Sequence, residues 1–180
     1  MDIKPRCNFK AIVAVCDDWG IGADGDMVVE NKADMRHFVA LTKGCTVIMG
    51  RKTLESFPGG RPLKNRRNIV LTRDPLFTRD GVEVVHSLDG ALGALASDEE
   101  AWVIGGGSIY EQFLPFCCEA EVTITRIRFS PTSMRTRYGR SLRAAVSRRL
   151  RMGRAMRALT MSSRPSAGCI GSIYAPFGYY

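Results

Sequence analysis

Two glycine-containing junctions in the chain are candidates for binding a flat or anionic ligand. At the first, an apolar run at residues 101–104 stops at Gly105-Gly106-Gly107 and resumes with apolar residues at helical spacing. This pattern predicts a strand, a tight turn and the start of a helix. The free N–H groups of a helix start and the small size of glycine let a ligand approach the backbone. A Gly-rich turn is also an ordinary end to a strand, and its spacing is not the Gly-x-Gly-x-x-Gly dinucleotide pattern.

The second junction places two cations and a hydroxyl at the start of a predicted helix. The apolar run 46–49 is followed by Gly50, Arg51, Lys52 and Thr53. Positive charges at a helix N-terminus oppose the helix dipole, so an anion such as a phosphate would stabilise them. The alternative is that these side chains simply face water.

A carboxylate lies on an otherwise apolar helical face. The spacing predicts a helix over residues 32–41, capped by Asn31, with one side formed by Ala33, Asp34, His37, Phe38 and Leu41. Asp34 is either a first-turn partner of the helix dipole or a buried group that recognises a ligand.

The order of the predicted elements indicates an α/β fold with a largely parallel sheet. Apolar or alternating runs predict strands at residues 9–16, 46–50, 68–73, 82–85, 101–105 and 120–127, and helices lie between several of them, including 88–96. Ligands in such sheets bind at the carboxyl ends of the strands, where Gly50, Arg73 and Gly105 fall. Residues 17–26, rich in Gly and Asp, form either a lid or an ordinary surface loop.

Size and composition favour one soluble domain. The chain has 180 residues and 45% apolar content, enough for a core without metals or cross-links. No stretch has the length of a membrane span and residues 1–9 are too polar for a signal peptide, so we expect a cytoplasmic protein. Six cysteines without a Cys-x-x-Cys pair and only two histidines predict reduced thiols and no metal site.

The net charge of +8 is confined to the C-terminal part. After Glu121 there are twelve arginines and no acid, whereas the preceding chain carries fourteen of the 26 cations and all 18 acids. A mildly acidic domain is therefore followed by an arginine-rich segment, and nucleic-acid binding by the domain itself is not expected.

The motifs taken together resemble bacterial dihydrofolate reductase. They recur in the order and spacing of that family from residue 9 to about 127, and comprise Ile21-Gly22, Asp34-x-x-x-Phe38, residues 47–53, Gly60-Arg61-Pro62-Leu63, Arg66-x-Asn68 with residues 69–71, and residues 104–107 followed by Tyr110. The resemblance implies a mostly parallel central sheet with flanking helices. It also implies a monomer that reduces 7,8-dihydrofolate to 5,6,7,8-tetrahydrofolate with NADPH, a reaction of one-carbon metabolism and an antifolate target.

The resemblance also implies the roles of individual residues. Asp34 would be the catalytic carboxylate that holds the pterin ring, supported by Thr123, and Arg66 would clamp the carboxylate of the glutamate tail. The other substrate-binding residues would be Val13, Phe38, Phe57, Leu63 and Ile104. The cofactor-binding residues would be Ala14, Ile21, Gly50, Arg51, Lys52, Thr53, Leu71, Thr72, Arg73, Ile104, Gly105, Gly106, Gly107, Ser108, Ile109 and Tyr110. Arg66 beside Arg67 also permits another interpretation, a pair of solvated cations.

The sequence departs from the family at two places. Val28-Val29 occupy the positions where the family usually carries Pro-Trp, and Lys32 stands where a proline is common. Beyond residue 127 the acidic loop and closing aromatic hairpin of the family are missing, and no strand pairing is evident. We therefore divide the chain into a dihydrofolate-reductase-like domain (1–127) and an arginine-rich C-terminal extension (128–180) that replaces the closing strands.

The origin and conformation of residues 128–180 admit several hypotheses. A reading-frame slip would explain the abrupt change of composition, and sequencing the coding DNA between the codons for Cys118 and Arg157 tests it. The segment is either a poorly ordered extension or a basic amphipathic helix over residues 140–159 that binds nucleic acid or acidic membrane.

Two other functions stay open at this point. One is a reductase of the same fold in pyrimidine or riboflavin metabolism, which Asp34-x-x-x-Phe38 and Arg66 disfavour. The other is a non-catalytic nucleotide-binding protein with a basic interaction tail.

Overall fold

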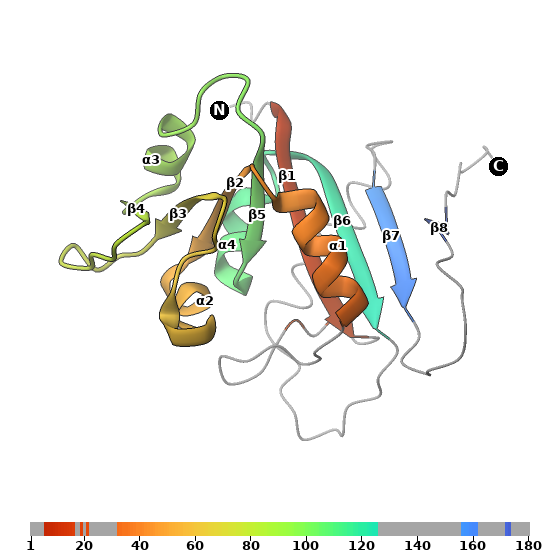
Figure 1. The fold of residues 1–180 in the computed structure, drawn as a ribbon. Helices are drawn as coiled ribbons and strands as arrows, with labels where there is room; N and C mark the ends of the chain where they lie inside the picture. The colour runs from red at the N-terminus through yellow and green to blue at the C-terminus, as the bar shows by residue number, and fades with distance from the viewer. Residues whose placement is uncertain are drawn as a thin grey trace.

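The computed structural model describes residues 6–16, 19, 21, 32–125, 156–161 and 172–173. The strands form one sheet in the order β4-β3-β2-β5-β1-β6-β7-β8 (Figure 1). Their bounds are β1 Arg6–Cys16, β2 Thr46–Gly50, β3 Arg67–Leu71, β4 Glu83–Val85, β5 Ala101–Gly105, β6 Cys117–Thr125, β7 Met156–Met161 and β8 Ser172–Ile173. All described pairs are parallel except β7 with β8. The predicted α/β fold with a mostly parallel sheet is confirmed.

The helices follow the strands as the periodicity predicts. They are α1 Lys32–Thr42, α2 Arg51–Glu55, α3 Leu88–Gly93 and α4 Gly107–Phe113, with a 3-10 turn at Pro58–Gly60. The helix α3 ends three residues earlier than predicted, and Ser87 caps its start by accepting a hydrogen bond from the Gly90 N–H (3.0 Å). None of the helices in the described part of the chain combines the length and the apolar content that crossing a bilayer requires.

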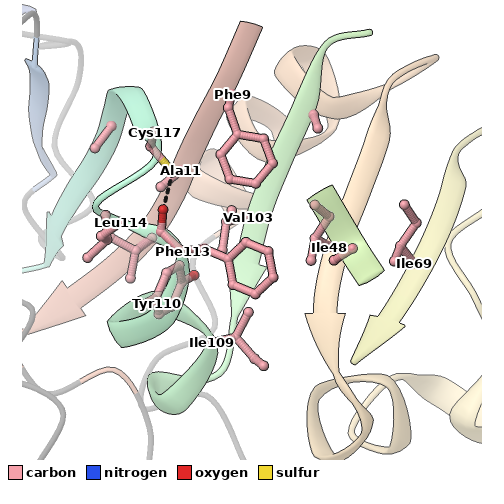
Figure 2. Packing of buried hydrophobic residues seen from close by; sticks show 14 of the residues in the cluster. Phe9, Ala11, Ile48, Ile69, Val103, Ile109, Tyr110, Phe113, Leu114 and Cys117 are labelled. Carbon is pink, nitrogen blue, oxygen red and sulfur yellow. Dashed lines mark hydrogen bonds between the residues drawn. The ribbon is translucent and has the colours of Figure 1, made fainter. Parts of the chain in front are cut away.

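One face of the sheet is covered by α3 and α4. Phe9, Ala11 and Val13 of β1 point to this face, because side chains alternate along a strand. Figure 2 shows α4 packing onto them through Tyr110 and Phe113, and the rings of Phe9 and Phe113 stack with centroids 5.9 Å apart. The buried surface fixes α4 against the sheet and thereby the turn that precedes it.

The opposite face carries α1. Here the buried side chains are Ile12, Val47, Met49, Leu54, Val70 and Trp102. Phe38 and Leu41 of α1 pack against them, as do Phe57, Leu63 and Ile104. In Figure 1, α1 lies across the sheet over β1 and β6. The predicted apolar side of α1 is confirmed, since Met35 and Val39 on its other side are exposed.

The sheet continues beyond residue 127, which the sequence did not indicate. Residues Met156–Met161 form β7 and pair in parallel with Ala120–Thr125 of β6, and β8 pairs with β7. The helix considered over residues 140–159 is therefore wrong at residues 156–159, while 140–155 lie outside the described residues. The reason is tertiary: the exposed N–H and C=O groups along the edge of β6 need partners, and a neighbouring strand supplies them.

Candidate active site

The carboxyl ends of the central strands meet at one edge of the sheet. Because β1, β2, β5 and β6 are parallel, the ends of these strands lie side by side. Gly50 ends β2 directly before α2, and Gly105 ends β5 just before α4. The strand β3 ends at Leu71, two residues before Arg73. The predicted clustering of Gly50, Arg73 and Gly105 at this edge follows from the topology.

Two glycines at this edge disfavour side chains, Gly50 through close contact and Gly105 through its backbone conformation. A Cβ on Gly50 would lie 3.1 Å from Ile109 Cγ1, and a Cβ on Gly106 would lie 3.4 Å from Thr53 Oγ1. Gly105 has φ +123°, which favours glycine, and its peptide bond to Gly106 is cis. The starts of α2 and α4 thus approach each other closely at this junction.

The cations expected at the start of α2 have different environments. The Arg51 guanidinium donates to Asp74 Oδ2 (2.9 Å), is paired with Glu55 (3.3 Å) and lies over the Phe77 ring (5.7 Å). Lys52 and Arg73 are exposed. The expectation that both cations at this helix start need an external anion is therefore wrong for Arg51, because Asp74 reaches it from the segment after β3.

The remaining cofactor candidates line the same edge. Thr72 is buried, its N–H donates to Val85 O (3.0 Å) and its hydroxyl accepts from the Asp74 N–H (3.2 Å). Ile21 and Leu71 pack on the cluster that includes Ile109 and Tyr110. Gly107 starts α4 and Ser108 is exposed. Ala14 is half-buried and pairs with Thr123 of β6.

Tyr110 connects the two halves of the candidate site. Its hydroxyl donates to the carbonyl of Ile12 (2.7 Å) and lies 3.4 Å from where a Cβ on Gly105 would be. Burial raises the pKa of Tyr110 well above its usual range, and the negative charge of Asp34 raises it further. The carboxylate of Asp34 is therefore within electrostatic reach of the junction at Gly105.

The helix α1 contacts β6 through His37 and Glu121. His37 Nε2 lies 3.6 Å from Glu121 Oε2, and the Glu121 side chain is only 4% exposed. Thr123, two residues further along β6, points to the same face and is buried. Asp34 precedes His37 by about one helical turn, toward the carboxyl ends of the strands, so Thr123 and Asp34 lie at the same level.

Arg66 lies at the other end of the apolar surface formed by Phe38, Phe57, Leu63 and Ile104. Its guanidinium lies 5.7 Å from the centre of the Phe38 ring. Nε donates to Thr42 Oγ1 (2.9 Å) and Nη1 to Lys64 O (2.8 Å). Nη2 is buried and has no hydrogen-bond partner among the described residues. Burial lowers the pKa of Arg66, and a buried donor of this kind favours an anionic ligand.

Arg67 points away from Arg66, so the interpretation of the two residues as a pair of solvated cations is wrong. Arg67 donates to Glu83 (2.6 Å), to Glu99 (2.8 Å) and to the Ala94 carbonyl (2.9 Å) at the amino ends of β4 and β5. Arg66 lies in the turn before β3, where its guanidinium contacts Thr42, Lys64 and the Phe38 ring, so the two guanidinium groups have unrelated environments.

One predicted substrate residue is turned away from the others. Val13 packs into the cluster under α4, on the face opposite to Phe38 and Ile104. Its neighbour Ile12 points to the α1 face instead. Ile12 was not among the predicted site residues. The alternation of side chains along β1 is the sequence signal that separates Ile12 from Val13. Asn31, Val28 and Val29 lie outside the described residues, as does the loop 17–26 apart from Trp19 and Ile21.

Comparisons with known proteins agree on one family. Residues 8–138 match the family model described as dihydrofolate reductase. The chain is 48% identical over 107 residues to dihydrofolate reductase type 3 of Salmonella typhimurium, a match covering 59% of this chain and 65% of that protein. It is 45% identical over 104 residues to the dihydrofolate reductase of Mycobacterium tuberculosis strain H37Rv, covering 57% and 62%. These matches span just under two thirds of each relative's length.

A solved structure has the same arrangement of elements. It is the dihydrofolate reductase from Enterococcus faecalis complexed with NADP(H) and RAB-propyl, with a TM-score of 0.63 and 32% identity, covering 70% of this chain and 75% of that one. The family model alone spans well over half of the chain. The sequence motifs, the sheet order and these matches together show that the chain belongs to the dihydrofolate reductase family.

Proposed function

We propose that this protein reduces 7,8-dihydrofolate to 5,6,7,8-tetrahydrofolate with NADPH. The observation that carries the proposal is one surface, on the α1 face, with opposite polarities at its ends. Asp34 precedes Phe38 by one turn of α1, Phe38 and Ile104 pack on the α1 face, and Arg66, whose Nη2 has no partner among the described residues, lies over the Phe38 ring. A pterin with an aminobenzoylglutamate tail has the complementary order: N–H donors, aromatic rings and a carboxylate.

At the pterin end, the Asp34 carboxylate would accept hydrogen bonds from the 2-amino group and a ring N–H. Two charge-assisted bonds fix the ring in its plane and favour proton delivery to N5. The backbone carbonyl of Ile12, held by Tyr110, would complete this end of the site, and we assign the contact to Ile12 rather than to the side chain of Val13. Thr123 would support Asp34 from β6.

At the tail end, Phe38, Phe57 and Leu63 would flank the aminobenzoyl ring. Nη2 of Arg66 would donate to the carboxylate next to the tail amide. The low local polarity that lowers the pKa of Arg66 also strengthens its attraction for a carboxylate.

The glycine junctions fit a dinucleotide cofactor. NADPH would supply the hydride when bound. Gly50, whose Cβ would lie 3.1 Å from Ile109, and Gly105, whose φ of +123° favours glycine, keep the backbone at this junction free of side chains, which supports close approach of a flat ring or a phosphate. Lys52, Thr53 and Ser108 would hold phosphates, and Arg73, exposed after β3, would hold the 2′-phosphate. Arg51 would attract the cofactor phosphates only weakly, because Asp74 and Glu55 already compensate much of its charge.

The proposal is tested by following NADPH absorbance after dihydrofolate is added to the purified chain. We expect turnover, and we expect Asp34→Asn to be slower by roughly a hundredfold or more at neutral pH, since an amide cannot supply the negative charge. NADPH binding by Asp34→Asn should be unchanged, which controls for folding. Absence of turnover in the unsubstituted chain, or equal rates for the two proteins, would refute the proposal.

We further propose that the protein acts as a cytoplasmic monomer on this small molecule, without a nucleic-acid partner. Among the described residues, Cys16, Cys45, Cys117 and Cys118 are thiols outside any disulfide, which suits a reducing compartment. The oligomeric state is checked by light scattering during gel filtration. The family matches do not favour the pyrimidine reductase or the non-catalytic alternative.

A further inference from the structure

The loop from Leu63 to Arg66 is held by one buried amide. Asn68, on β3, is 4% exposed. Its Oδ1 accepts from the Leu63 N–H (3.0 Å), and its Nδ2 donates to the carbonyls of Leu63 (2.9 Å) and Arg66 (3.0 Å). One side chain thus ties both ends of the loop that carries the two residues proposed to contact the substrate tail.

A buried hydroxyl holds the guanidinium from the other side. Thr42, the last residue of α1, is fully buried, and its hydroxyl donates to the Phe38 carbonyl (2.7 Å). The same oxygen accepts from Arg66 Nε (2.9 Å). Because Nη1 is bound to the Lys64 carbonyl of the loop, the guanidinium is fixed by α1 and by the loop at once, and Nη2 is left for a ligand.

We propose that Asn68 and Thr42 are positioning residues that preset Arg66 for the carboxylate of a tailed pterin. The inference rests on the proposed function and specifies how the chain selects pterins that carry an aminobenzoylglutamate tail. A guanidinium already held in one orientation loses less conformational freedom when it binds a carboxylate, and a small displacement weakens a directional contact sharply.

The test compares two probes that differ only in the tail, folate and 6-methylpterin. Their dissociation constants are measured by quenching of tryptophan fluorescence in the presence of NADPH. Asn68→Ala should weaken folate binding about tenfold, the usual effect of losing bonds that support a charged group, and leave 6-methylpterin binding unchanged. Thr42→Val should act in the same direction, whereas Thr42→Ser, which keeps the hydroxyl, should restore folate affinity.

Two controls separate positioning from a general loss of stability. Phe113 lies in the core under α4, on the face opposite to Arg66. Phe113→Leu should therefore lower the melting temperature without changing the ratio of the dissociation constants for folate and 6-methylpterin. Arg66→Leu removes the guanidinium, and in that background Asn68→Ala should produce no further loss of folate affinity.

The outcomes distinguish this inference from the proposed function. Equal weakening of both probes by Asn68→Ala and Thr42→Val, or an undiminished effect of Asn68→Ala in the Arg66→Leu background, would overturn the inference alone. Unchanged folate affinity in Arg66→Leu would also overturn the inference, but it would not contradict the proposed reduction of the pterin ring. Failure of the unsubstituted chain to bind either pterin would refute the proposed function and the inference with it.

Discussion

At the scale of single residues, Tyr110 joins α4 to β1 and to the glycine turn at the end of β5. Its hydroxyl satisfies the buried carbonyl of Ile12, its ring packs in the core under α4, and it lies against Gly105. Burial keeps this phenol protonated, because it raises the pKa of Tyr110. Tyr110 is therefore a neutral hydrogen-bond donor at neutral pH.

Tyr110→Phe should reduce the free energy of unfolding by about 1–3 kcal/mol, because the Ile12 carbonyl loses its donor inside the core. Urea denaturation of the two proteins measures the difference. Phe113→Tyr is unsuitable as a control since it adds a buried hydroxyl, so Phe9→Leu, which removes ring contacts only, is the better comparison. An unchanged stability of Tyr110→Phe would show that the bond to Ile12 contributes nothing.

At the scale of elements, the amino ends of β2, β3, β4 and β5 are joined by charges. Arg67 of β3 bonds to Glu83 of β4 and to Glu99 before β5, and the hydroxyl of Thr46 on β2 donates to Glu99. Burial would raise the pKa of Glu99, but the bonds from Thr46 and Arg67 outweigh it and the net pKa is lowered. The hydrogen bonds that Arg67 donates to Glu83 and Glu99 raise the pKa of Arg67.

Arg67→Gln should lower the melting temperature at neutral pH. A carboxylate with a lowered pKa stabilises the fold above its unfolded pKa, and this contribution is lost as pH falls through the folded pKa. The difference between the two proteins should therefore shrink below about pH 4, the ordinary range of glutamate. The network is partly exposed, so the effect at neutral pH should be modest. Thermal scans between pH 7 and pH 3 check this, and a difference independent of pH would contradict the role of Glu99.

At the scale of the whole molecule, the sheet depends on a segment remote in the sequence. The strand β7 covers the edge of β6 along six paired positions, from Ala120 with Met156 to Thr125 with Met161. Without β7, β6 would be an edge strand whose unpaired N–H and C=O groups can pair with strands of other chains. Residues Met156–Met161 therefore have a structural role irrespective of the charge they carry.

A chain ending at residue 127 should aggregate at lower concentration and melt at lower temperature than the full chain. The expected cause is the exposed edge of β6. Light scattering against concentration and a thermal scan measure both effects. A chain ending at residue 173 keeps β7 and β8 and should behave like the full chain. Equal solubility and melting temperature of the chain ending at 127 would show that β7 is dispensable.

The sequence by itself determined which residues share an element and a face. Apolar alternation and helical spacing are local properties, so the sheet class, the glycine junctions at Gly50 and Gly105, and the apolar side of α1 with Asp34 could all be predicted from them. The same alternation separates Ile12 from Val13, although only contact with neighbouring elements shows what each face packs against.

The tertiary structure alone decided which groups from distant parts of the chain come together. Asp74 neutralises Arg51, Glu121 meets His37, and Thr42 orients Arg66, each through contacts that no local pattern encodes. The pairing of β7 with β6 is of the same kind, because an unpaired strand edge can recruit a segment of weak intrinsic preference. Local periodicity determines which side chains lie on each face of an element. Long-range packing determines which groups from other elements contact that face.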